Sequence, residues 1–288
     1  MNLPTLNFRK IYVVMPLYNH SELRILNFIN EIVGAGFLPL LVNNNSQSVC
    51  LGSIKIFNNG SNFGIAKALN QGIEYALDNN ADQIMLFDQD SFLTSDELIL
   101  LSNTASHLFA GDNKIAAAGP MFYESNANQF HGFAQYGTLK IEKIVFGGGA
   151  QPCLFLISSG TVLSSKCLRH IGLMDELLFI DYVDVEWCLR AASLGYKIFG
   201  MPNVIMKHEV GYFKKQFLWY KIPYHSQFRL YFQTRNSLIM YMRGYIPMRW
   251  KICDMIYFIK RTVFYICIDA VSIKTIFRAV SDAIIFKK

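Results

Sequence analysis

The stretch Ile84-Met85-Leu86-Phe87-Asp88-Gln89-Asp90-Ser91 gives the first indication of how this chain of 288 residues folds. Its four apolar residues predict a short buried strand, and two carboxylates one residue apart follow at its carboxyl end. Open α/β sheets bind their ligands at this edge. Carboxylates so close together repel each other unless a cation lies between them, and their hard oxygens suit Mg²⁺ or Mn²⁺ beside a diphosphate. The alternative is a solvated turn, so the rest of the chain must decide.

The sequence before this stretch alternates strands and helices, which predicts a mostly parallel, Rossmann-like central sheet flanked by helices. Polar runs such as Asn43-Asn44-Asn45-Ser46 follow the strands, and we expect them to gather at the same edge of the sheet. After the stretch, Thr94 and Glu97 predict a helix that begins with a capping box. The predicted strands are Ile11 to Met15, Leu38 to Val42 and Ile54 to Phe57, and the predicted helices are Ser21 to Val33, Phe63 to Leu77 and Ser95 to Phe109.

The second half of the chain has a different pattern. Strands and glycine-rich loops run from Met121 to Ile157, which indicates an insertion or a mixed-sheet half. Gly147-Gly148-Gly149 is not followed by Lys-Ser/Thr, which argues against a Walker phosphate site. A later helix is predicted to begin at Asp184, with this residue as its N-cap. Aromatic amphipathic helices are expected over His225 to Arg243 and from Pro247 to the end.

The composition indicates contact with a lipid surface or a partner, because 52% of the residues are hydrophobic and only 17% are charged. The net charge of +6 belongs to residues 243–288, which hold nine Lys/Arg and three Asp/Glu, so the first 242 residues are neutral. Aromatic residues alternate with these basic ones, which favours a helix that lies on an anionic membrane surface. The alternative is a helix packed on the catalytic domain or on a second copy. No recognisable RNA or DNA module accompanies the charge, so we expect no nucleic-acid partner.

The N-terminal residues do not have the pattern of a signal peptide, and the longest charge-free stretch, Ile144 to Ser165, contains helix-breaking Gly and Pro residues. We therefore expect a cytoplasmic protein that is peripheral on the inner face of the plasma membrane. Its six cysteines have neither CxxC nor metal-ligand spacing and are interpreted as buried thiols.

Several motifs in order along the chain carry a resemblance to a known family. They are Val14-Met15-Pro16-Leu17-Tyr18-Asn19, the run Asn43 to Ser46, Asn62-Phe63-Gly64-Ile65-Ala66-Lys67-Ala68-Leu69-Asn70, Asp88-Gln89-Asp90, and Asp181-Tyr182-Val183-Asp184-Val185-Glu186-Trp187. Together they resemble glycosyltransferase family 2, the inverting enzymes with the GT-A fold, and most closely its bacterial rhamnosyltransferase-like members. The resemblance covers about Ile11 to Arg243. It implies a catalytic domain of residues 1–242, with a donor half of about 1–120 and an acceptor half of about 121–242, and a basic amphipathic tail of residues 243–288.

The resemblance also implies roles for residues that bind the nucleotide-sugar donor. In the family the nucleoside lies against the loops after the first two strands, and the diphosphate and its metal, Mg²⁺ or Mn²⁺, lie at the paired acids. The second-strand position, often aspartate in the family, is Asn43 here, and its amide can still pair with a base edge. Carried over to this sequence, the donor-binding residues are Pro16, Tyr18, Asn19, Asn43, Asn62, Gly64, Lys67 and Asp88, and the metal ligands are Asp90 and His208.

The catalytic residues follow from the last motif. Asp184 matches the family's general base, while Val183 replaces the usual preceding glutamate and leaves Asp181 as a rival. The base takes a proton from the acceptor hydroxyl as its oxygen attacks the anomeric carbon, and one displacement gives inversion. Glu186 and Trp187 are expected to shape the acceptor pocket. Arg235-Asn236 is a minor candidate for the diphosphate, and a helix-surface arginine is the simpler interpretation.

The resemblance implies transfer of a sugar, L-rhamnose from dTDP-L-rhamnose, to a lipid-linked glycan in the assembly of O-antigen or another surface polysaccharide. A UDP-hexose-dependent transferase is the nearest alternative. A nucleotidyltransferase would need a basic triphosphate loop near the first strand, where only His20 is present. A third alternative is a non-catalytic subunit that binds a sugar nucleotide.

Overall fold

A computed structural model describes residues 9–19, 22–124, 128–145, 147–208, 214–217, 220–223, 226–268 and 271–285. Its central sheet has the strand order β3-β2-β1-β4-β10-β5-β11-β9, with β6 paired to β5. The strands are β1 (Ile11–Leu17), β2 (Leu38–Asn43), β3 (Lys55–Asn58), β4 (Gln83–Leu86), β5 (Ile115–Glu124), β6 (Gln129–His131), β9 (Gln151–Cys153), β10 (Thr161–Ser164) and β11 (Lys197–His208).

The strands β3, β2, β1 and β4 are parallel to one another, and β11 is parallel to β5. β10 is antiparallel to both β4 and β5, so the sheet is mixed at its centre. The predicted α/β class is confirmed, and the four strands predicted in the first 90 residues are present within two residues of their predicted bounds.

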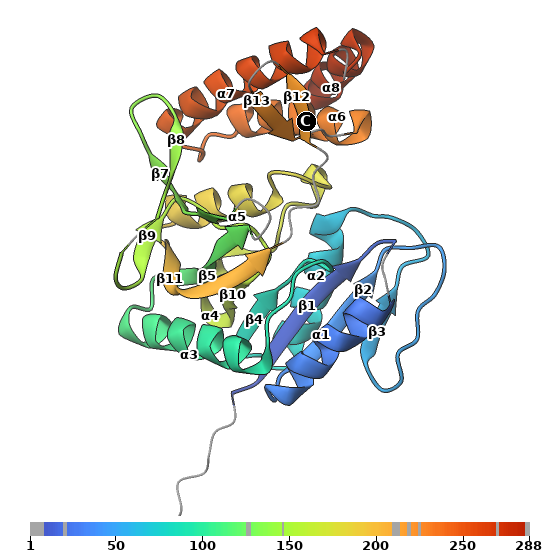
Figure 1. Cartoon of the computed structure of the whole chain (residues 1–288), viewed down its shortest axis with the longest axis vertical. Coiled ribbons are helices and arrows are strands. Elements are labelled where there is room, and N and C mark those ends of the chain that lie inside the picture. The colour runs from blue at the N-terminus through green and yellow to red at the C-terminus, as the bar shows by residue number, and fades with distance from the viewer. Residues whose placement is uncertain are drawn as a thin grey trace, which may run out of the picture.

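Helices cover both faces of this sheet (Figure 1). On one face α1 (Glu22–Gly34) and α3 (Ser95–Gly111) pack against Val13 and Met15 of β1. On the other, α2 (Ile65–Asp78), α4 (Ser165–Ile171) and α5 (Val183–Ser193) pack against Val14. The alternation of side chains along a strand explains why neighbouring β1 residues belong to different clusters. The capping box predicted for Thr94 and Glu97 is present at the start of α3.

The second half adds two smaller sheets and a layer of C-terminal helices. The hairpin of β7 (Phe133–Tyr136) and β8 (Ile141–Ile144) extends from the central sheet towards α7, as Figure 1 shows. A second pair, β12 (Lys214–Phe217) and β13 (Tyr220–Pro223), precedes α6 (Gln227–Met242). A short 3₁₀ helix, Glu176–Leu178, lies before α5.

The C-terminal tail forms α7 (Met248–Cys267) and α8 (Ile273–Ile285), and both helices pack on α6. Trp250 is 1% exposed among Leu189 of α5 and Met240 of α6, while Tyr265 packs with Leu230. None of the described helices is long and apolar enough to span a bilayer. The domain division at residue 242 coincides with the end of α6 and stays a prediction.

Candidate active site

A cleft of about 450 Å³ opens at the carboxyl ends of β1, β2 and β4. This is the edge at which the sequence predicted a ligand. We call it the strand-end cleft. Five of the predicted donor-binding residues line it, Pro16, Tyr18, Asn62, Gly64 and Asp88, together with Leu17, Asn44, Ile65, Gln89, Phe179, Ile180, Ser226, Phe228 and Arg229.

The middle residue of the acidic motif fixes the loop that follows β1. Gln89 accepts a hydrogen bond from the Tyr18 N–H at 2.7 Å and donates its own N–H to the Tyr18 carbonyl at 2.8 Å. The paired bonds hold Tyr18, which is half exposed, at the rim of the cleft. Asn19, the next residue, has a positive φ of 50° and is not among the residues that line the cleft.

Asn43, the last residue of β2, and Asn44, which follows it, have different roles, and that of Asn43 differs from the prediction. Asn43 is completely buried, and its amide donates to Asn58 Oδ1 and the Gln47 carbonyl, each at 2.8 Å. Its side chain therefore stabilises its own loop. Asn44 lines the cleft instead and donates to the Gly64 carbonyl at 2.9 Å.

The N-terminus of α2 is occupied by the protein's own backbone. The Ile65 N–H donates to the Phe179 carbonyl at 2.7 Å, and the Ala66 N–H approaches the same oxygen at 3.4 Å. Gly64 has a φ of +89°, and a Cβ there would lie 2.6 Å from the Phe179 ring, so only glycine fits. These first N–H groups already have a partner, so they are not free to bind a diphosphate. Lys67 lies on this first turn 3.9 Å from Glu176 and does not line the cleft.

Three carboxylates interact electrostatically beside the strand-end cleft. Burial, followed by repulsion from Asp90 and Asp184, raises the pKa of Asp88 to about 7, and Arg229 opposes this shift. Burial also raises the pKa of Asp184 to about 6, although two backbone N–H groups stabilise its charged form. A carboxylate that titrates near neutral pH can accept a proton in catalysis. Asp90 is exposed and is not a lining residue of the cleft.

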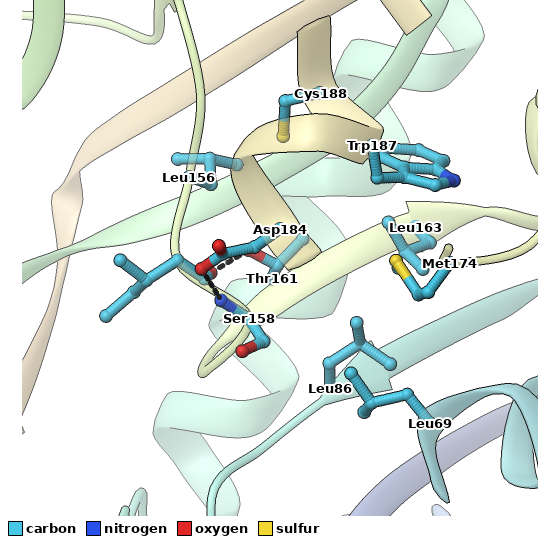
Figure 2. A pocket seen from close by; sticks show the side chains of 11 residues that line it. Leu69, Leu86, Leu156, Ser158, Thr161, Leu163, Met174, Asp184, Trp187 and Cys188 are labelled. Carbon is cyan, nitrogen blue, oxygen red and sulfur yellow. Dashed lines mark hydrogen bonds between the residues drawn. The ribbon is translucent and has the colours of Figure 1, made fainter. Parts of the chain in front are cut away.

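Two adjacent serines connect this acidic motif to Asp184. The Ser158 N–H donates to Asp184 Oδ2 at 3.2 Å, as Figure 2 shows, and the Val185 N–H donates to Oδ1 at 2.8 Å. Ser159 is fully buried, accepts from the Asp88 N–H at 3.3 Å and bonds Ser91. One short segment therefore fixes the spacing between the strand that carries Asp88 and the helix that carries Asp184.

Asp184 does not cap its helix. The N-cap is Tyr182, in the left-handed conformation with a φ of 66°, and Asp184 is the second residue of α5. The predicted N-cap is therefore wrong. Phe179 and Asp181 also have positive φ angles, of 62° and 63°, so the segment Phe179–Tyr182 is a turn in which non-glycine residues adopt left-handed conformations. Such conformations cost of order 1–3 kcal/mol each and persist only where the surroundings hold them. We call this segment the left-handed turn.

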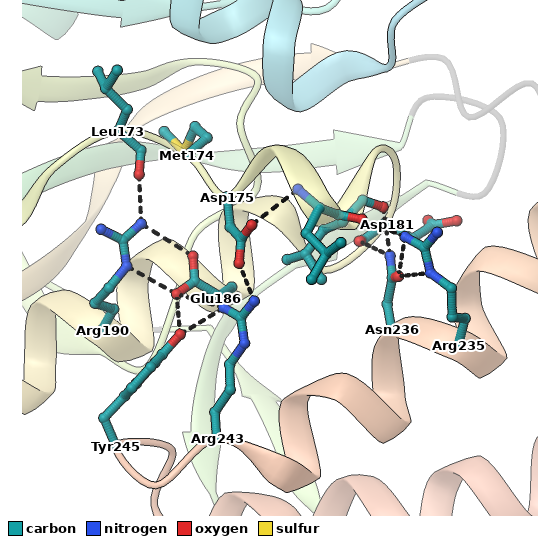
Figure 3. Close-up of polar contacts among 12 residues, drawn as sticks. Leu173, Met174, Asp175, Asp181, Glu186, Arg190, Arg235, Asn236, Arg243 and Tyr245 are labelled. Carbon is teal, nitrogen blue, oxygen red and sulfur yellow. Dashed lines mark hydrogen bonds and ion pairs between the residues drawn. The ribbon is translucent and has the colours of Figure 1, made fainter. Parts of the chain in front are cut away.

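Helix α6 holds the left-handed turn in place. Asn236 is completely buried, and its amide donates to the carbonyls of Leu178, Ile180 and Asp181 at 2.8 to 3.0 Å (Figure 3). Arg235 is also buried and bonds the Leu177 carbonyl and the Asn236 side chain. Both interpretations of Arg235 from the sequence are therefore corrected, because it is neither on the surface nor in the cleft.

Arg229 of the same helix pairs with Asp181 through three contacts of 3.0 to 3.1 Å. This arginine lines the strand-end cleft and was missed by the sequence analysis. No signal in the sequence distinguishes it from Arg235, the other arginine of this helix. The pair also separates the two base candidates, because Asp181 has a cation bound to it while Asp184 has only N–H donors.

Glu186 and Trp187 lie in the interior and not in a pocket open to an acceptor. Glu186 is completely buried and pairs with Arg190 at 2.9 Å and Arg243 at 3.2 Å, while it accepts a bond from the Tyr245 hydroxyl (Figure 3). The Trp187 indole donates to the Gly172 carbonyl at 2.8 Å and lines only a small enclosed cavity beside Asp184 (Figure 2). Their expected contact with the acceptor is therefore corrected to a structural role.

Comparison with known proteins identifies the family. No protein-family model matches the sequence. The curated dTDP-rhamnosyl transferase RfbF of Shigella flexneri is 31% identical over 266 residues, which cover 89% of this chain and 88% of that protein. The chain belongs to the rhamnosyltransferase-like group of glycosyltransferase family 2.

Solved structures agree on the fold of this glycosyltransferase. GalNAc-T7 with UDP, GalNAc and Mn²⁺ aligns with a TM-score of 0.57 over 97% of this chain and 58% of that one, at 12% identity. TarS of S. aureus aligns with a TM-score of 0.50 over 80% of this chain and 39% of that one, at 13% identity. The chain spans less than two thirds of either. The likeness confirms the predicted GT-A fold, and the chain is a glycosyltransferase.

The metal ligands of the glycosyltransferase stay a prediction. His208 is the last residue of β11, but its side chain lies outside the described residues, so its expected metal contact cannot be followed. Within the described part, no three His, Cys, Asp or Glu side chains lie close enough together to hold a metal. The chemistry of the donor set still fits a hard cation, because Asp90 and Asp184 both raise the pKa of Asp88 by repulsion that a cation would relieve.

The contacts of α6 predict that Asn236 positions the left-handed turn. In an Asn236→Leu variant, three carbonyls lose their hydrogen-bond donor, which is expected to lower the free energy of unfolding by about 1–3 kcal/mol. The variant is also expected to have a much lower kcat, while its KM for the nucleotide sugar changes little. Denaturant unfolding and steady-state kinetics measure both. The matched control is Gln233→Leu, one turn earlier, since the Oε1 of Gln233 is buried with no hydrogen-bond partner in the described structure. Equal kcat losses in the two variants would contradict the positioning role.

Proposed function

We propose that this protein is an inverting glycosyltransferase that transfers L-rhamnose from dTDP-L-rhamnose to a lipid-linked glycan during assembly of O-antigen or another surface polysaccharide. The observation that carries the proposal is that two adjacent residues, Ser158 and Ser159, bond Asp184 at the start of α5 and Asp88 just after β4, beside the strand-end cleft. The name of the relative in Shigella flexneri supports the donor.

In the proposed mechanism the donor occupies the strand-end cleft. Tyr18 and Asn44 contact the nucleoside, Asp88 contacts the ribose, and Arg229 offsets charge on the diphosphate. Asp90 and His208 would hold Mg²⁺ or Mn²⁺, and this cation would supply positive charge beside the departing nucleoside diphosphate. Asp184 takes the proton of the acceptor hydroxyl as its oxygen attacks the anomeric carbon from the face opposite the diphosphate. Asp181, bound by Arg229, keeps that cation at the cleft.

The alternatives have less support. A nucleotidyltransferase needs several basic residues at a triphosphate, and Arg229 is the one cation among the described residues that line the cleft. A non-catalytic subunit gives no reason for a carboxylate with a pKa of about 6 beside the acidic motif. A UDP-hexose enzyme of the same family would use the same contacts, so an assay must separate it.

Release of nucleoside diphosphate from a panel of sugar nucleotides tests the donor. With Mg²⁺ or Mn²⁺ and a lipid-linked acceptor present, we expect release from dTDP-L-rhamnose at a rate at least ten times that from dTDP-glucose, UDP-glucose or UDP-galactose, and none in EDTA. Discrimination of this size corresponds to about 1.4 kcal/mol in the transition state. Faster release from a UDP-hexose would replace the proposed donor.

The base role of Asp184 predicts the pH dependence of the reaction. The base acts in its charged form, so kcat/KM is expected to rise with pH through about 6 and to fall about tenfold for each unit below it. Asp184→Asn, which keeps the side-chain shape, is expected to reduce kcat by at least a factor of about 100 while dTDP still binds. Asp181→Asn serves as the comparison. A larger loss of kcat in that variant than in Asp184→Asn would exchange the two roles.

We further propose that the tail holds the enzyme on the anionic inner surface of the membrane. The buried face of α7 carries Trp250, Cys253 and Tyr265. Its opposite face exposes a continuous apolar stripe at helical spacing, made of Met248, Ile252, Met255, Ile259, Val263 and Ile266. α8 adds exposed Ile273 and Phe277. A surface helix normally exposes polar residues there, so the stripe favours a lipid partner, and the basic excess of the tail complements anionic headgroups.

Flotation with liposomes that contain anionic phospholipid tests this surface. Deletion of the tail would remove buried Trp250 and disrupt packing, so point variants are needed. Replacing Ile252, Ile259 and Val263, which are 46%, 54% and 54% exposed, by Ser is expected to reduce the floated fraction at least fivefold. The control replaces Val33, Leu100 and Leu194, which are 53%, 49% and 51% exposed elsewhere. Equal flotation of both triple variants would exclude the stripe as the membrane contact.

A further inference from the structure

A second pocket, of about 430 Å³, lies between the β7–β8 hairpin and α7. We call it the hairpin pocket. Leu139, Ile141, Phe155 and Tyr257 give it an apolar lining. Lys140 and Lys260 contribute two cations, and Asp254 contributes one carboxylate. None of these residues lines the strand-end cleft, so the donor does not account for the pocket.

The two walls of the hairpin pocket are held together by contacts of the folded chain. Arg249 of α7 donates to the Gly137 carbonyl at 3.1 Å, and its guanidinium lies 4.7 Å from the centre of the Tyr136 ring. Tyr136 and Ile141 also pack on the cluster that contains buried Trp250. The pocket is therefore formed by fixed elements, and a ligand need not order it.

The pocket is connected to the catalytic residues through both of its walls. Asp254 at its inner side accepts hydrogen bonds from the hydroxyls of Tyr182, at 3.0 Å, and Tyr241, at 2.7 Å, and Tyr182 is the N-cap of the helix that carries Asp184. From the other wall, Lys143 of β8 interacts electrostatically with Asp184. Phe155 precedes Ser158, whose N–H binds Asp184, by three residues.

The chemistry of the lining selects an amphiphile with an anionic head. Lysines bind phosphate groups as point charges, while the aromatic and aliphatic side chains offer no partner for a polar molecule alone. Lys140 is paired with Glu142 at 3.2 Å, but both side chains are largely exposed, and such pairs exchange readily for a doubly charged group. Tyr257 and Lys260 belong to α7, the helix whose outer face exposes the apolar stripe. A lipid could therefore reach the pocket directly from a membrane under that stripe.

We propose that the hairpin pocket binds the diphosphate and the first isoprenoid units of the lipid-linked acceptor. Lys140 and Lys260 bind the diphosphate, and the saccharide extends past Phe155 towards Asp184. This rests on the proposed function for the existence of a lipid-linked acceptor. The hairpin pocket adds the place where the lipid end of the acceptor is held. It also explains how a soluble nucleotide sugar and a membrane lipid reach one base from two different sides.

Titration calorimetry of the full-length protein with farnesyl diphosphate tests the proposal. The Lys140→Ala/Lys260→Ala variant is expected to bind this probe at least tenfold more weakly, because two charge-assisted contacts to phosphate are lost. The charge-matched control is Lys166→Ala/Lys274→Ala, two exposed lysines outside the pocket. Equal affinity in the pocket variant and the control would overturn the proposal.

Further probes separate the lipid from the phosphate. Inorganic diphosphate and farnesol are each expected to bind at least tenfold more weakly than farnesyl diphosphate, and Tyr257→Ser is expected to weaken only the farnesyl probes. Inorganic diphosphate that binds as tightly as farnesyl diphosphate would overturn the assignment of a lipid. Binding of dTDP is expected to be unchanged in every variant. If dTDP does not bind the unmodified protein, the proposed donor fails, whereas the farnesyl diphosphate result stands or falls by itself.

Discussion

The left-handed turn Phe179–Tyr182 is the constraint on which the rest of the site depends. Its Phe179 carbonyl receives the first N–H of α2, its Tyr182 caps α5, and Phe179 and Ile180 line the strand-end cleft. Because three non-glycine residues there have positive φ, the turn cannot hold this shape alone. Asn236 and Arg229 supply the missing stabilisation from α6. The helix before the tail therefore holds the turn that precedes Asp184, the proposed base.

This arrangement explains why helix ends in the enzyme do not act as anion sites by themselves. The N-terminus of α2 would attract a phosphate if its N–H groups were free. Since the Phe179 carbonyl accepts the first of these N–H groups, α2 instead holds the left-handed turn at a fixed distance from β2 and β4. Positive charge at the cleft comes from Arg229, and negative charge comes from Asp88 and its two acidic neighbours. Asp184 accepts hydrogen bonds from the backbone N–H groups of Ser158 and Val185, and its burial raises its pKa to about 6.

Local patterns predicted the parts of the fold that are determined locally. The apolar run before Asp88, the alternation of strands and helices in the first half and the Thr94 capping box depend on hydrophobic period and cap chemistry within a few residues. The left-handed turn was not predictable in this way, because its partners Arg229 and Asn236 lie 48 to 56 residues away and its φ values have no sequence signature. For the same reason Asp184 was taken as an N-cap, since an aspartate at a helix start usually is one. Glu186 was misplaced because its partners Arg243 and Tyr245 come from beyond α6.

The strand-end cleft and the hairpin pocket lie at different parts of the molecule. The strand-end cleft lies at the carboxyl edge of the parallel strands, while the hairpin pocket lies beside α7, in the layer of helices that exposes the apolar stripe. Asp184 interacts electrostatically with Asp88 of the acidic motif and with Lys143 of the hairpin. Donor and acceptor that enter from opposite sides of one carboxylate suit a single in-line displacement, because the nucleophile and the leaving diphosphate must lie on opposite faces of the anomeric carbon. With the acceptor in the hairpin pocket, as proposed, any movement of α7 would move it relative to Asp184, the proposed base.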